Sequence, residues 1–389
     1  MPPIPSPSES SPSCWLFCTV IDNFGDIGVS WRLARMLNQE MGWTVHLWLD
    51  DADALAAIAP ELPALPCLHQ QIHVRHWPSD GLIDDPAQLP PPAAVIEMFG
   101  CNLPEAVQTV IRQTRPLWLN WEYLSAEPWA QRMHGKPSPQ ADGLQKYFWL
   151  MGFTDDSGGL LRERDYLPPA ESDNADYRHT LGLPPKTSSE WLIFGYRSAK
   201  WPQWWQMWQQ AGQPLTLLLA GNTVLDSLKQ AGIVPDTALN EPGSLFDSGH
   251  LRLIRLPFVA QDNFDRLLSL ADGLIVRGED SFVRAQLSGK PFLWHIYPQD
   301  ESAHLDKLHA FWHLAADSFS PDFRQAFDIL SDDLNDGLNL SDSERLAAWQ
   351  TLSSHWPQWQ QYAQAWQNWL LSQPSAVEKL ANFIQDTLK

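Results

Sequence analysis

The sequence predicts an α/β protein of two domains, each built around a mostly parallel sheet. Short apolar runs rich in β-branched and aromatic residues alternate with helical patterns along most of the chain, which is typical of such sheets. The chain has 389 residues, more than one hydrophobic core of ordinary size would use. A polar, Pro-containing stretch interrupts the series once, so we expect a linker over 162–189.

The first domain, expected over 14–161, opens with one strand–helix–strand unit. Its parts are a buried-strand pattern, a turn-rich loop, a helical pattern and a second strand, at Trp15–Ile21, Asp22–Gly28, Val29–Met41 and Thr44–Leu49. Further strands are predicted at Ala94–Met98, Pro116–Trp121 and Tyr147–Phe153. Residues 1–13 are rich in Pro and Ser, and we expect them to form a disordered tail.

The second domain, expected over 190–355, repeats the pattern. Strands are predicted at Trp191–Tyr196, Leu215–Ala220, Leu251–Phe258, Gly273–Val276 and Pro291–Trp294. Helices are predicted at Gln203–Gln210, Asp262–Ala271 and Phe282–Leu287, and helical patterns continue from about Ala303 to the end. Ligands of parallel sheets bind at the carboxyl ends of the strands, so the loops that follow strands should carry the functional residues, at a cleft between the domains.

The amino-acid composition disfavours some classes of binding partner and some cellular locations. With 26 Lys and Arg against 46 Asp and Glu, the net charge of −20 argues against broad binding of nucleic acid, which needs clustered cations. A small basic pocket for one phosphorylated ligand remains compatible with it. No apolar run is long enough to span a bilayer, and the first residues do not resemble a signal peptide. The cysteines form no CxxC pair, so we expect a cytoplasmic protein with reduced thiols.

The chain contains 21 Trp residues. Many occur in helical patterns, such as Trp201, Trp204, Trp205 and Trp208. We expect most of them to pack in the core, since Trp buries a large apolar area. A role in stacking on a sugar is the alternative for a few.

The segment Arg277-Gly278-Glu279-Asp280-Ser281 stands between a predicted strand and a predicted helix. Asp280 or Ser281 could cap that helix, whose first N–H groups and dipole favour a phosphate. Arg277 would add charge-assisted hydrogen bonds to phosphate oxygens. The pattern fits an ordinary capped helix with a surface ion pair equally well.

The segment Asp22–Gly28 follows the first predicted strand. Gly25 and Gly28 permit close backbone approach to a ligand, and Asp22 and Asp26 could accept a proton or orient a cationic nucleophile. A turn held by Asx hydrogen bonds explains the same residues. The glycine spacing is not GxGxxG, which disfavours a dinucleotide site.

Aromatic residues follow two other strands of the second domain. Phe194 and Tyr196 could stack on a nucleobase or reach a phosphate, and Phe258 with Gln261 could frame the edge of a base. Core packing is the alternative for all of them. His309 and His313 have helical i, i+4 spacing, but no HExxH motif or third close ligand is present, so no metal site is expected.

Four segments resemble one known family, the bacterial protein-arginine rhamnosyltransferases of the EarP type, which modify translation elongation factor P. They are Val20–Leu37, Pro116–Glu127, Phe194–Ser198 and Arg277–Glu301, and the similarity extends from about Cys14 to the C-terminus. The resemblance implies a GT-B glycosyltransferase fold, with two Rossmann-like domains facing a central cleft. It implies an acceptor-binding first domain, a nucleotide-sugar-binding second domain, and C-terminal helices, 356–389, that return toward the first domain.

The resemblance also implies the reaction and its residues. It points to an inverting transfer of L-rhamnose from dTDP-β-L-rhamnose to an arginine of elongation factor P, with no metal and no other cofactor. It assigns catalysis to Asp26 and Glu279, with Asp22, Asn23 and Gly25 on the acceptor side. It assigns the donor to Phe194, Tyr196, Phe258, Gln261, Arg277, Asp280 and Ser281. As a hypothesis, Asp26 orients the acceptor guanidinium and takes up its proton, while Arg277, Tyr196 and the helix start near Ser281 stabilise the leaving diphosphate.

Three alternatives remain at this stage. The chain could be a GT-B transferase with a small-molecule or lipid-linked acceptor. It could be a nicotinamide-dependent oxidoreductase, although the GxGxxG motif is missing. It could also be a non-catalytic protein that binds elongation factor P.

Overall fold

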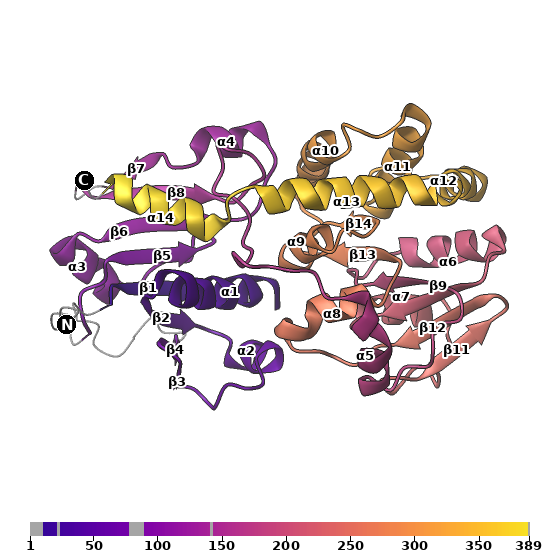
Figure 1. Cartoon of the computed structure of the whole chain (residues 1–389), viewed down its shortest axis with the longest axis horizontal. Helices are drawn as coiled ribbons and strands as arrows, with labels where there is room; N and C mark the ends of the chain where they lie inside the picture. Colours follow the sequence, from indigo (N-terminus) through magenta and orange to yellow (C-terminus); the bar gives the residue numbers. More distant parts are fainter. Residues whose placement is uncertain (1–10, 22–23, 78–88, 141–142, 388–389) are drawn as a thin grey trace, which may run out of the picture. The chain divides into compact units, whose positions relative to one another are not determined.

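The computed structural model describes residues 11–21, 24–77, 89–140 and 143–387. Asp22 and Asn23 therefore lie outside the described residues. The chain divides into two compact units, one of residues 1–166 and 374–389 and the other of residues 167–373. Each unit holds a sheet of mostly parallel strands with helices packed on it, which confirms the predicted α/β class (Figure 1).

The first unit holds a sheet with the strand order β3-β4-β2-β1-β5-β6-β8-β7. Its strands are β1 (Ser13–Cys18), β2 (Thr44–Leu49), β3 (Cys67–His69), β4 (Ile72–His76), β5 (Ala94–Met98), β6 (Leu117–Glu122), β7 (Pro137–Pro139) and β8 (Gln145–Leu150). Its helices are α1 (Phe24–Met41), α2 (Ala52–Ile58), α3 (Glu105–Thr114), α4 (Pro128–Met133) and α14 (Ala376–Thr387). Among the described strands of this first sheet, only the short edge strands β3 and β7 pair with their neighbours in antiparallel fashion.

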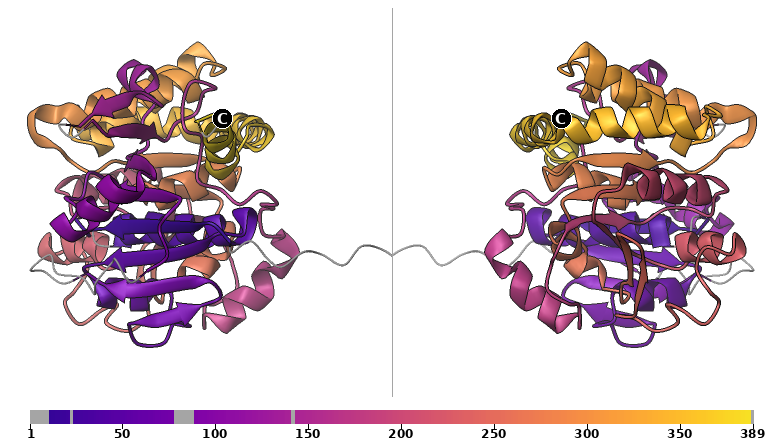
Figure 2. Two further views of the ribbon diagram at one scale, coloured as in Figure 1. Left: turned by 90° about the vertical axis from the view of Figure 1, so that its left-hand side faces the viewer. Right: turned by 90° about the vertical axis from the view of Figure 1, so that its right-hand side faces the viewer.

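Helices cover both faces of this sheet, with α3 on one face and α1 on the other (Figure 2). Trp15 and Phe17 of β1 are fully buried in a core cluster that includes Val107 and Ile111 of α3. Leu16 points to the opposite face because side chains alternate along a strand. Both faces of β1 are thus covered, which explains why its sequence is apolar without alternation.

The last helix, α14, belongs to the first unit. The Phe383 ring meets the Trp149 and Tyr147 rings of β8 edge to face, with centroids 5.6 Å and 5.5 Å apart. Lys379 Nζ donates to the carbonyl oxygens of Thr154 and Ser157 at 2.8 Å and 2.9 Å. The chain end is therefore fixed to the first unit by apolar and polar contacts.

The second unit holds a sheet with the strand order β11-β12-β10-β9-β13-β14. Its strands are β9 (Ser189–Ile193), β10 (Leu215–Leu219), β11 (Leu245–Ser248), β12 (Leu251–Arg255), β13 (Gly273–Arg277) and β14 (Phe292–His295). Its α-helices are α5 (Asn174–Thr180), α6 (Lys200–Ala211), α7 (Thr223–Gln230), α8 (Phe264–Ser269), α9 (Asp280–Leu287), α10 (Ala303–Ala315), α11 (Pro321–Leu334), α12 (Asp342–Ser354) and α13 (Trp356–Ser372). Short 3₁₀ turns occur at Glu171–Asp173, Gln261–Asn263 and Asp300–Ser302.

Tryptophan fills much of both cores, as predicted. Trp191 of β9 is 1% exposed, and its ring leaves no room beside β13. A Cβ on Gly273 would lie 2.4 Å from that ring, so glycine is required there. None of the helices in the described part of the chain is long and apolar enough to cross a membrane.

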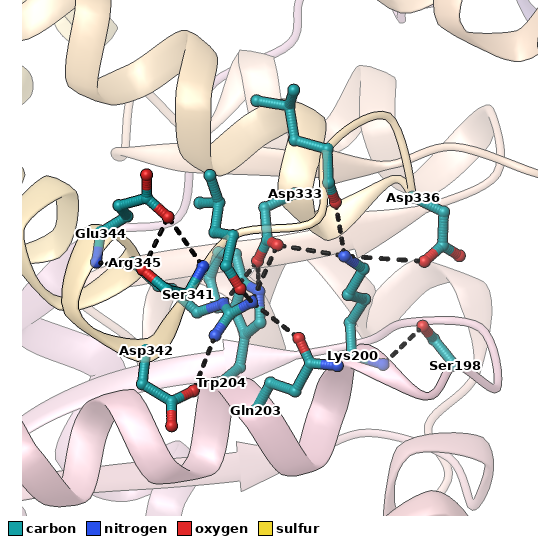
Figure 3. Close-up of polar contacts among 12 residues, drawn as sticks. Ser198, Lys200, Gln203, Trp204, Asp333, Asp336, Ser341, Asp342, Glu344 and Arg345 are labelled. Carbon is teal, nitrogen blue, oxygen red and sulfur yellow. Dashed lines mark hydrogen bonds and ion pairs between the residues drawn. The ribbon is translucent and has the colours of Figure 1, made fainter.

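A buried polar network joins α6, α11 and α12 of the second unit (Figure 3). Asp333 is fully buried, and both its carboxylate oxygens accept two hydrogen bonds. Arg345 donates to Oδ2 at 2.7 Å and to Oδ1 at 3.0 Å, Lys200 donates to Oδ1 at 3.1 Å, and Trp204 Nε1 donates to Oδ2 at 2.9 Å. The charges are therefore paired and hydrogen-bonded, which buried charges require.

Three sequence-based expectations differ from the structure. The predicted loop Asp22–Gly28 is helical from Phe24 onward, because α1 begins there. The second unit begins at Leu167 and includes α5, so the expected linker 162–189 is partly folded into it. Of the C-terminal helices expected over 356–389 to return toward the first domain, α13 belongs to the second unit and only the part from Pro374 onward belongs to the first.

Candidate active site

The strand order of the second unit places one functional candidate on each side of a topological switch point. From β9 the chain continues outward through β10 and β12, and then crosses to β13 on the other side of β9. Parallel α/β sheets bind ligands at this point, outside the carboxyl ends of the strands. Phe194 follows β9 directly and Arg277 ends β13, so both residues lie there.

The guanidinium of Arg277 lies against two aromatic rings. Its Cζ lies 4.5 Å from the centroid of the Phe194 ring and 4.9 Å from that of Tyr196. Its Nη1 donates to Gly195 O and to Thr223 Oγ1, both at 3.3 Å. The guanidinium is therefore fixed in direction, and it supplies a positive charge at the switch point.

Gly195, whose carbonyl oxygen accepts a hydrogen bond from Arg277, packs closely against two side chains. A Cβ on Gly195 would lie 2.3 Å from the Trp201 ring and 3.0 Å from His295 Nδ1, so only glycine fits. His295 Nδ1 accepts a hydrogen bond from Tyr196 N at 3.2 Å. Burial, and then the charge of Arg277, lower the pKa of His295 to about 3, so the ring is neutral at physiological pH and can accept this bond.

Helix α9 starts three residues after Arg277, and its first turn differs from the prediction. The N-cap position is Glu279, whose side chain makes no capping hydrogen bond, and the helix begins at Asp280, so the expectation that Asp280 or Ser281 caps it is wrong. Ser281 Oγ instead donates to Arg277 O, and Asp280 Oδ2 accepts from Gln261 Nε2 at 3.0 Å. The first N–H groups of a helix have no acceptor within it, which suits an anion beside Arg277.

Glu279 is paired with a lysine that the sequence analysis missed. Lys307 Nζ, on α10, lies 2.8 Å from Glu279 Oε1, and the two side chains are 17% and 13% exposed. Lys307 also lies 5.9 Å from the centroid of the Trp294 ring. The carboxylate thus has a cationic partner, which accounts for an acidic residue next to a predicted anion site.

The other aromatic positions lie along the same sheet edge. Phe194 meets Phe264 edge to face, with centroids 5.9 Å apart. Phe258 follows β12 and is 59% exposed. The structure thus brings Phe194 and Tyr196 onto Arg277, joins Gln261 to Asp280, and leaves Phe258 exposed at the carboxyl edge of the sheet.

In the first unit, Asp26 lies in the first turn of α1, where the helix dipole favours a negative charge. Its Oδ2 accepts a hydrogen bond from Ile21 N at 2.8 Å, and its Oδ1 accepts one from Tyr123 at 3.2 Å. Asp26 is 2% exposed, whereas Ile21 beside it is 75% exposed. Gly25 precedes Asp26 in the same turn, so the described residues hold this buried carboxylate in a defined position in the first turn of α1.

Tyr123 is a second residue that the sequence analysis did not single out. It follows β6, and its ring stacks on Phe99, which follows β5, with centroids 4.2 Å apart. Phe99 has a φ of 56°, a left-handed conformation that is costly for an aromatic residue. The position of Tyr123 directly after a strand was the signal that could have identified it, since Tyr123 and Phe99 both lie at the carboxyl edge of the first sheet.

Potential metal ligands do not gather in the described residues. No group of three or more His, Cys, Asp or Glu side chains with metal-binding geometry occurs among them. His309 Nε2 pairs with Asp332 Oδ1 at 2.7 Å, and the His304 ring contacts Gln299 N and Asn335 O, both at 3.2 Å. These histidines therefore have structural partners.

Comparison with known proteins gives consistent results. The family model described as Elongation-Factor P (EF-P) rhamnosyltransferase EarP matches residues 14–385. A protein-arginine rhamnosyltransferase of Neisseria meningitidis serogroup B (strain H44/76) is 58% identical over 371 residues, which cover 95% of this chain and 96% of the relative. A solved structure that describes EarP-mediated arginine glycosylation of translation elongation factor EF-P aligns with a TM-score of 0.64 at 29% identity, covering 96% and 99% of the two chains.

A more distant structure supports the fold. TcCGT1 in complex with UDP aligns with a TM-score of 0.57 at 12% identity, covering 97% of this chain and 99% of that one. The predicted GT-B fold is thus confirmed. The match to the family model over nearly the whole chain, and the identity to the Neisseria protein, leave one assignment: this chain belongs to the EarP family of protein-arginine rhamnosyltransferases.

Proposed function

We propose that this enzyme transfers L-rhamnose from dTDP-β-L-rhamnose to an arginine side chain of elongation factor P in the cytoplasm, with inversion at the anomeric carbon. Membership of the EarP family supports the acceptor, because the related solved structure concerns arginine glycosylation of EF-P. The observation that carries the proposal is the fixed Arg277 guanidinium at the switch point of the second sheet. Such a group suits the diphosphate of a nucleotide-sugar.

The proposed donor site lies in the second unit. Phe194 and the exposed Phe258 would pack on the thymine, with Gln261 at its edge. Arg277, Tyr196 and the first turn of α9 would bind the diphosphate, because together they offer a guanidinium, a hydroxyl and helix N–H groups. As the bond from the anomeric carbon to oxygen breaks, negative charge grows on the leaving diphosphate, and these donors stabilise it.

This donor set supplies the positive charge that the leaving group needs, so we propose that the enzyme needs no added metal and no other cofactor. Glu279, paired with Lys307 at 2.8 Å, would orient the bound donor from the side of α10. The proposal predicts that a chelator leaves transfer unchanged.

The proposed acceptor site lies in the first unit. Arginine is protonated at neutral pH, with a pKa above about 12, and is a poor nucleophile. Asp26, held by Ile21 N and Tyr123, would bind the guanidinium and turn one nitrogen toward the anomeric carbon. That nitrogen forms the new bond as dTDP departs, and its proton passes to the Asp26 carboxylate. Asp22, Asn23 and Gly25 would support this side of the site.

The test is incubation of the purified enzyme with elongation factor P and dTDP-β-L-rhamnose, followed by mass analysis of the factor and of its peptides. The expected result is the addition of one deoxyhexose to one arginine, with an α-anomeric signal by NMR. Binding of the factor without a mass increase would contradict the transfer. Transfer to a small molecule but not to the factor would contradict the acceptor.

A further inference from the structure

A tight turn follows β5 in the first unit. Met98 O accepts a hydrogen bond from Cys101 N at 3.1 Å, and the two central residues, Phe99 and Gly100, have φ angles of 56° and 67°. A turn whose central φ angles are both positive is of type I′, which favours Asn, Asp or Gly at its first central position. Phe99 therefore occupies a position that its own backbone preference disfavours.

Two hydrogen bonds to β6 hold this turn. Phe99 N donates to Trp121 O at 2.7 Å. Gly100 N donates to Asn120 Oδ1 at 2.9 Å. The other end of the Asn120 amide donates to Glu122 Oε1 at 2.6 Å, which fixes the direction in which the amide faces. Asn120 is 5% exposed, so water has little access to its amide.

The turn is linked to the acceptor-side carboxylate through one tyrosine. The Phe99 ring stacks on the Tyr123 ring, with centroids 4.2 Å apart and 11° between the planes. The Tyr123 hydroxyl donates to Asp26 Oδ1 at 3.2 Å. Strained backbone persists where the surrounding structure holds it, and such residues cluster at functional sites. Here the strained turn places an aromatic ring where the residues favoured in such turns would leave none.

We propose that Asn120 and Phe99 are positioning residues for Asp26. Asn120 holds the turn, the turn carries the Phe99 ring, and the ring fixes Tyr123 so that its hydroxyl bonds one oxygen of the carboxylate. This role depends on the proposed function, in which Asp26 binds the acceptor guanidinium. Its orientation matters for transfer because the attacking nitrogen must point at the anomeric carbon.

The test measures transfer by the full-length enzyme from dTDP-β-L-rhamnose to elongation factor P. We expect Asn120→Ala to lower kcat about 3-fold to 10-fold, the loss that corresponds to one hydrogen bond. Its affinity for dTDP should change less than about 2-fold, because the proposed donor residues lie in the other unit.

Asn38→Ala is the matched control. Asn38 is also a buried asparagine of the first unit, and its Nδ2 donates to Trp43 O at 2.8 Å near the last turn of α1. The control removes a comparable hydrogen bond far along the helix from Asp26, so kcat should change less than about 2-fold. An equal loss of kcat in both variants would mean that Asn120 acts only through the stability of the unit.

A double variant separates positioning from a general loosening of the fold. If Asn120 acts through the Tyr123 hydroxyl, adding Asn120→Ala to Tyr123→Phe should lower kcat less than about 2-fold further. Independent effects would instead multiply. A multiplied loss would therefore contradict the proposed positioning role.

Phe99→Asn tests the ring without depending on Asn120. Asparagine is favoured in such turns, so the backbone strain is relieved while the stack on Tyr123 is lost. We expect kcat to fall about 3-fold to 10-fold, because an aromatic pair contributes about as much as one hydrogen bond. If Asn120→Ala does not fold, wild-type kcat in Phe99→Asn decides against the positioning role.

Failure of this role can be told apart from failure of the proposed function. Wild-type kcat in Asp26→Asn would remove the proposed task of Asp26, and the task of Asn120 and Phe99 with it. Loss of transfer in Asp26→Asn, together with wild-type kcat in Asn120→Ala and Phe99→Asn, would overturn the positioning role alone.

Discussion

Lys307 Nζ lies 2.8 Å from Glu279 Oε1, and both side chains are largely shielded from water. The pair joins the N-cap position of α9 to the second turn of α10. A charge-assisted bond in such surroundings is stronger than one on the surface, and breaking it removes a cationic partner of the carboxylate. Lys307 therefore qualifies as a positioning residue: it holds Glu279, and Glu279 is the residue proposed to orient the donor.

Replacing Lys307 should separate this positioning role from donor binding. We expect Lys307→Met to lower kcat about 10-fold or more while the donor KM changes less than about 3-fold, because Glu279 loses the group that holds it. Lys307→Arg should recover much of the activity. Lys229→Met, at a half-buried lysine of the same unit that lies far along the chain from Glu279, is the matched control for the charge. Equal kcat in Lys307→Met and the control would disprove the role.

Tyr123 should contribute to catalysis through its hydroxyl rather than through its ring. Tyr123→Phe removes the donor 3.2 Å from Asp26 Oδ1 but keeps the stack on Phe99. We expect kcat to fall about 10-fold to 150-fold with little change in thermal stability, since one hydrogen bond to a charged group is worth about 1.5–3 kcal/mol. The control is Tyr147→Phe, whose hydroxyl bonds Gln145 on the surface of the same unit. Wild-type kinetics in Tyr123→Phe would show that Asp26 does not depend on this bond.

Asp26→Asn tests the proposed proton acceptor. The amide keeps the size of the side chain but carries no charge and binds a proton poorly, so transfer should fall at least about 100-fold. Affinity for dTDP should stay within about 2-fold of the unmodified enzyme, because every proposed donor residue lies in the other unit. Normal turnover in a quantitative mass assay would remove Asp26 from the mechanism.

The sheet could be predicted where strands are buried on both faces. The predicted strands Thr44–Leu49 and Ala94–Met98 coincide with β2 and β5, because continuous apolar runs are typical of such strands. The start of α1 was missed, since Gly25 and Gly28 suggest a turn although both lie in its first two turns. Tertiary packing here overrides the local preference of glycine.

The sequence could likewise indicate some residues of the candidate site and not others. The proximity of Phe194 and Arg277 follows from the rule that parallel strands end at one edge, so the sequence could indicate it. Tyr123 obeys the same rule and lay within a segment that carried the family resemblance. The pairing of Lys307 with Glu279 spans 28 positions and depends on how α10 packs, for which no local pattern exists.

Arg277→Ala should weaken binding of dTDP at least about 10-fold, because the guanidinium is the fixed cation of the proposed diphosphate site. Arg277→Lys should not restore full affinity, since an ammonium group cannot reproduce the planar contacts with Phe194 and Tyr196. Calorimetry measures both values. Arg252→Ala, which breaks an exposed ion pair with Asp247, is the control. Unchanged affinity in Arg277→Ala would place the diphosphate elsewhere.

The buried carboxylate of Asp333 should control the acid stability of the second unit. Burial by itself would raise the pKa of Asp333, but hydrogen bonds from Arg345 and Lys200 outweigh it and hold the pKa below the ordinary value. Asp333→Asn leaves these two cations without their carboxylate, and we expect a loss of about 3–5 kcal/mol in the free energy of unfolding at neutral pH. Asp328→Asn, at a partly solvent-exposed i, i+4 pair with Arg324, should cost less than about 1 kcal/mol.

The pH dependence of this loss in the free energy of unfolding tests the role of the Asp333 charge more directly. Because the folded pKa of Asp333 lies below its unfolded value of about 3.9, the stabilisation is complete above that value and is lost as the pH falls through the folded pKa. Urea unfolding followed by tryptophan fluorescence should therefore show a constant gap between the unmodified enzyme and Asp333→Asn from about pH 8 to pH 5. Below about pH 4 the gap should shrink, because the unmodified enzyme also loses the charge. A gap that stays constant as the acid transition is approached would mean that Asp333 acts through packing alone.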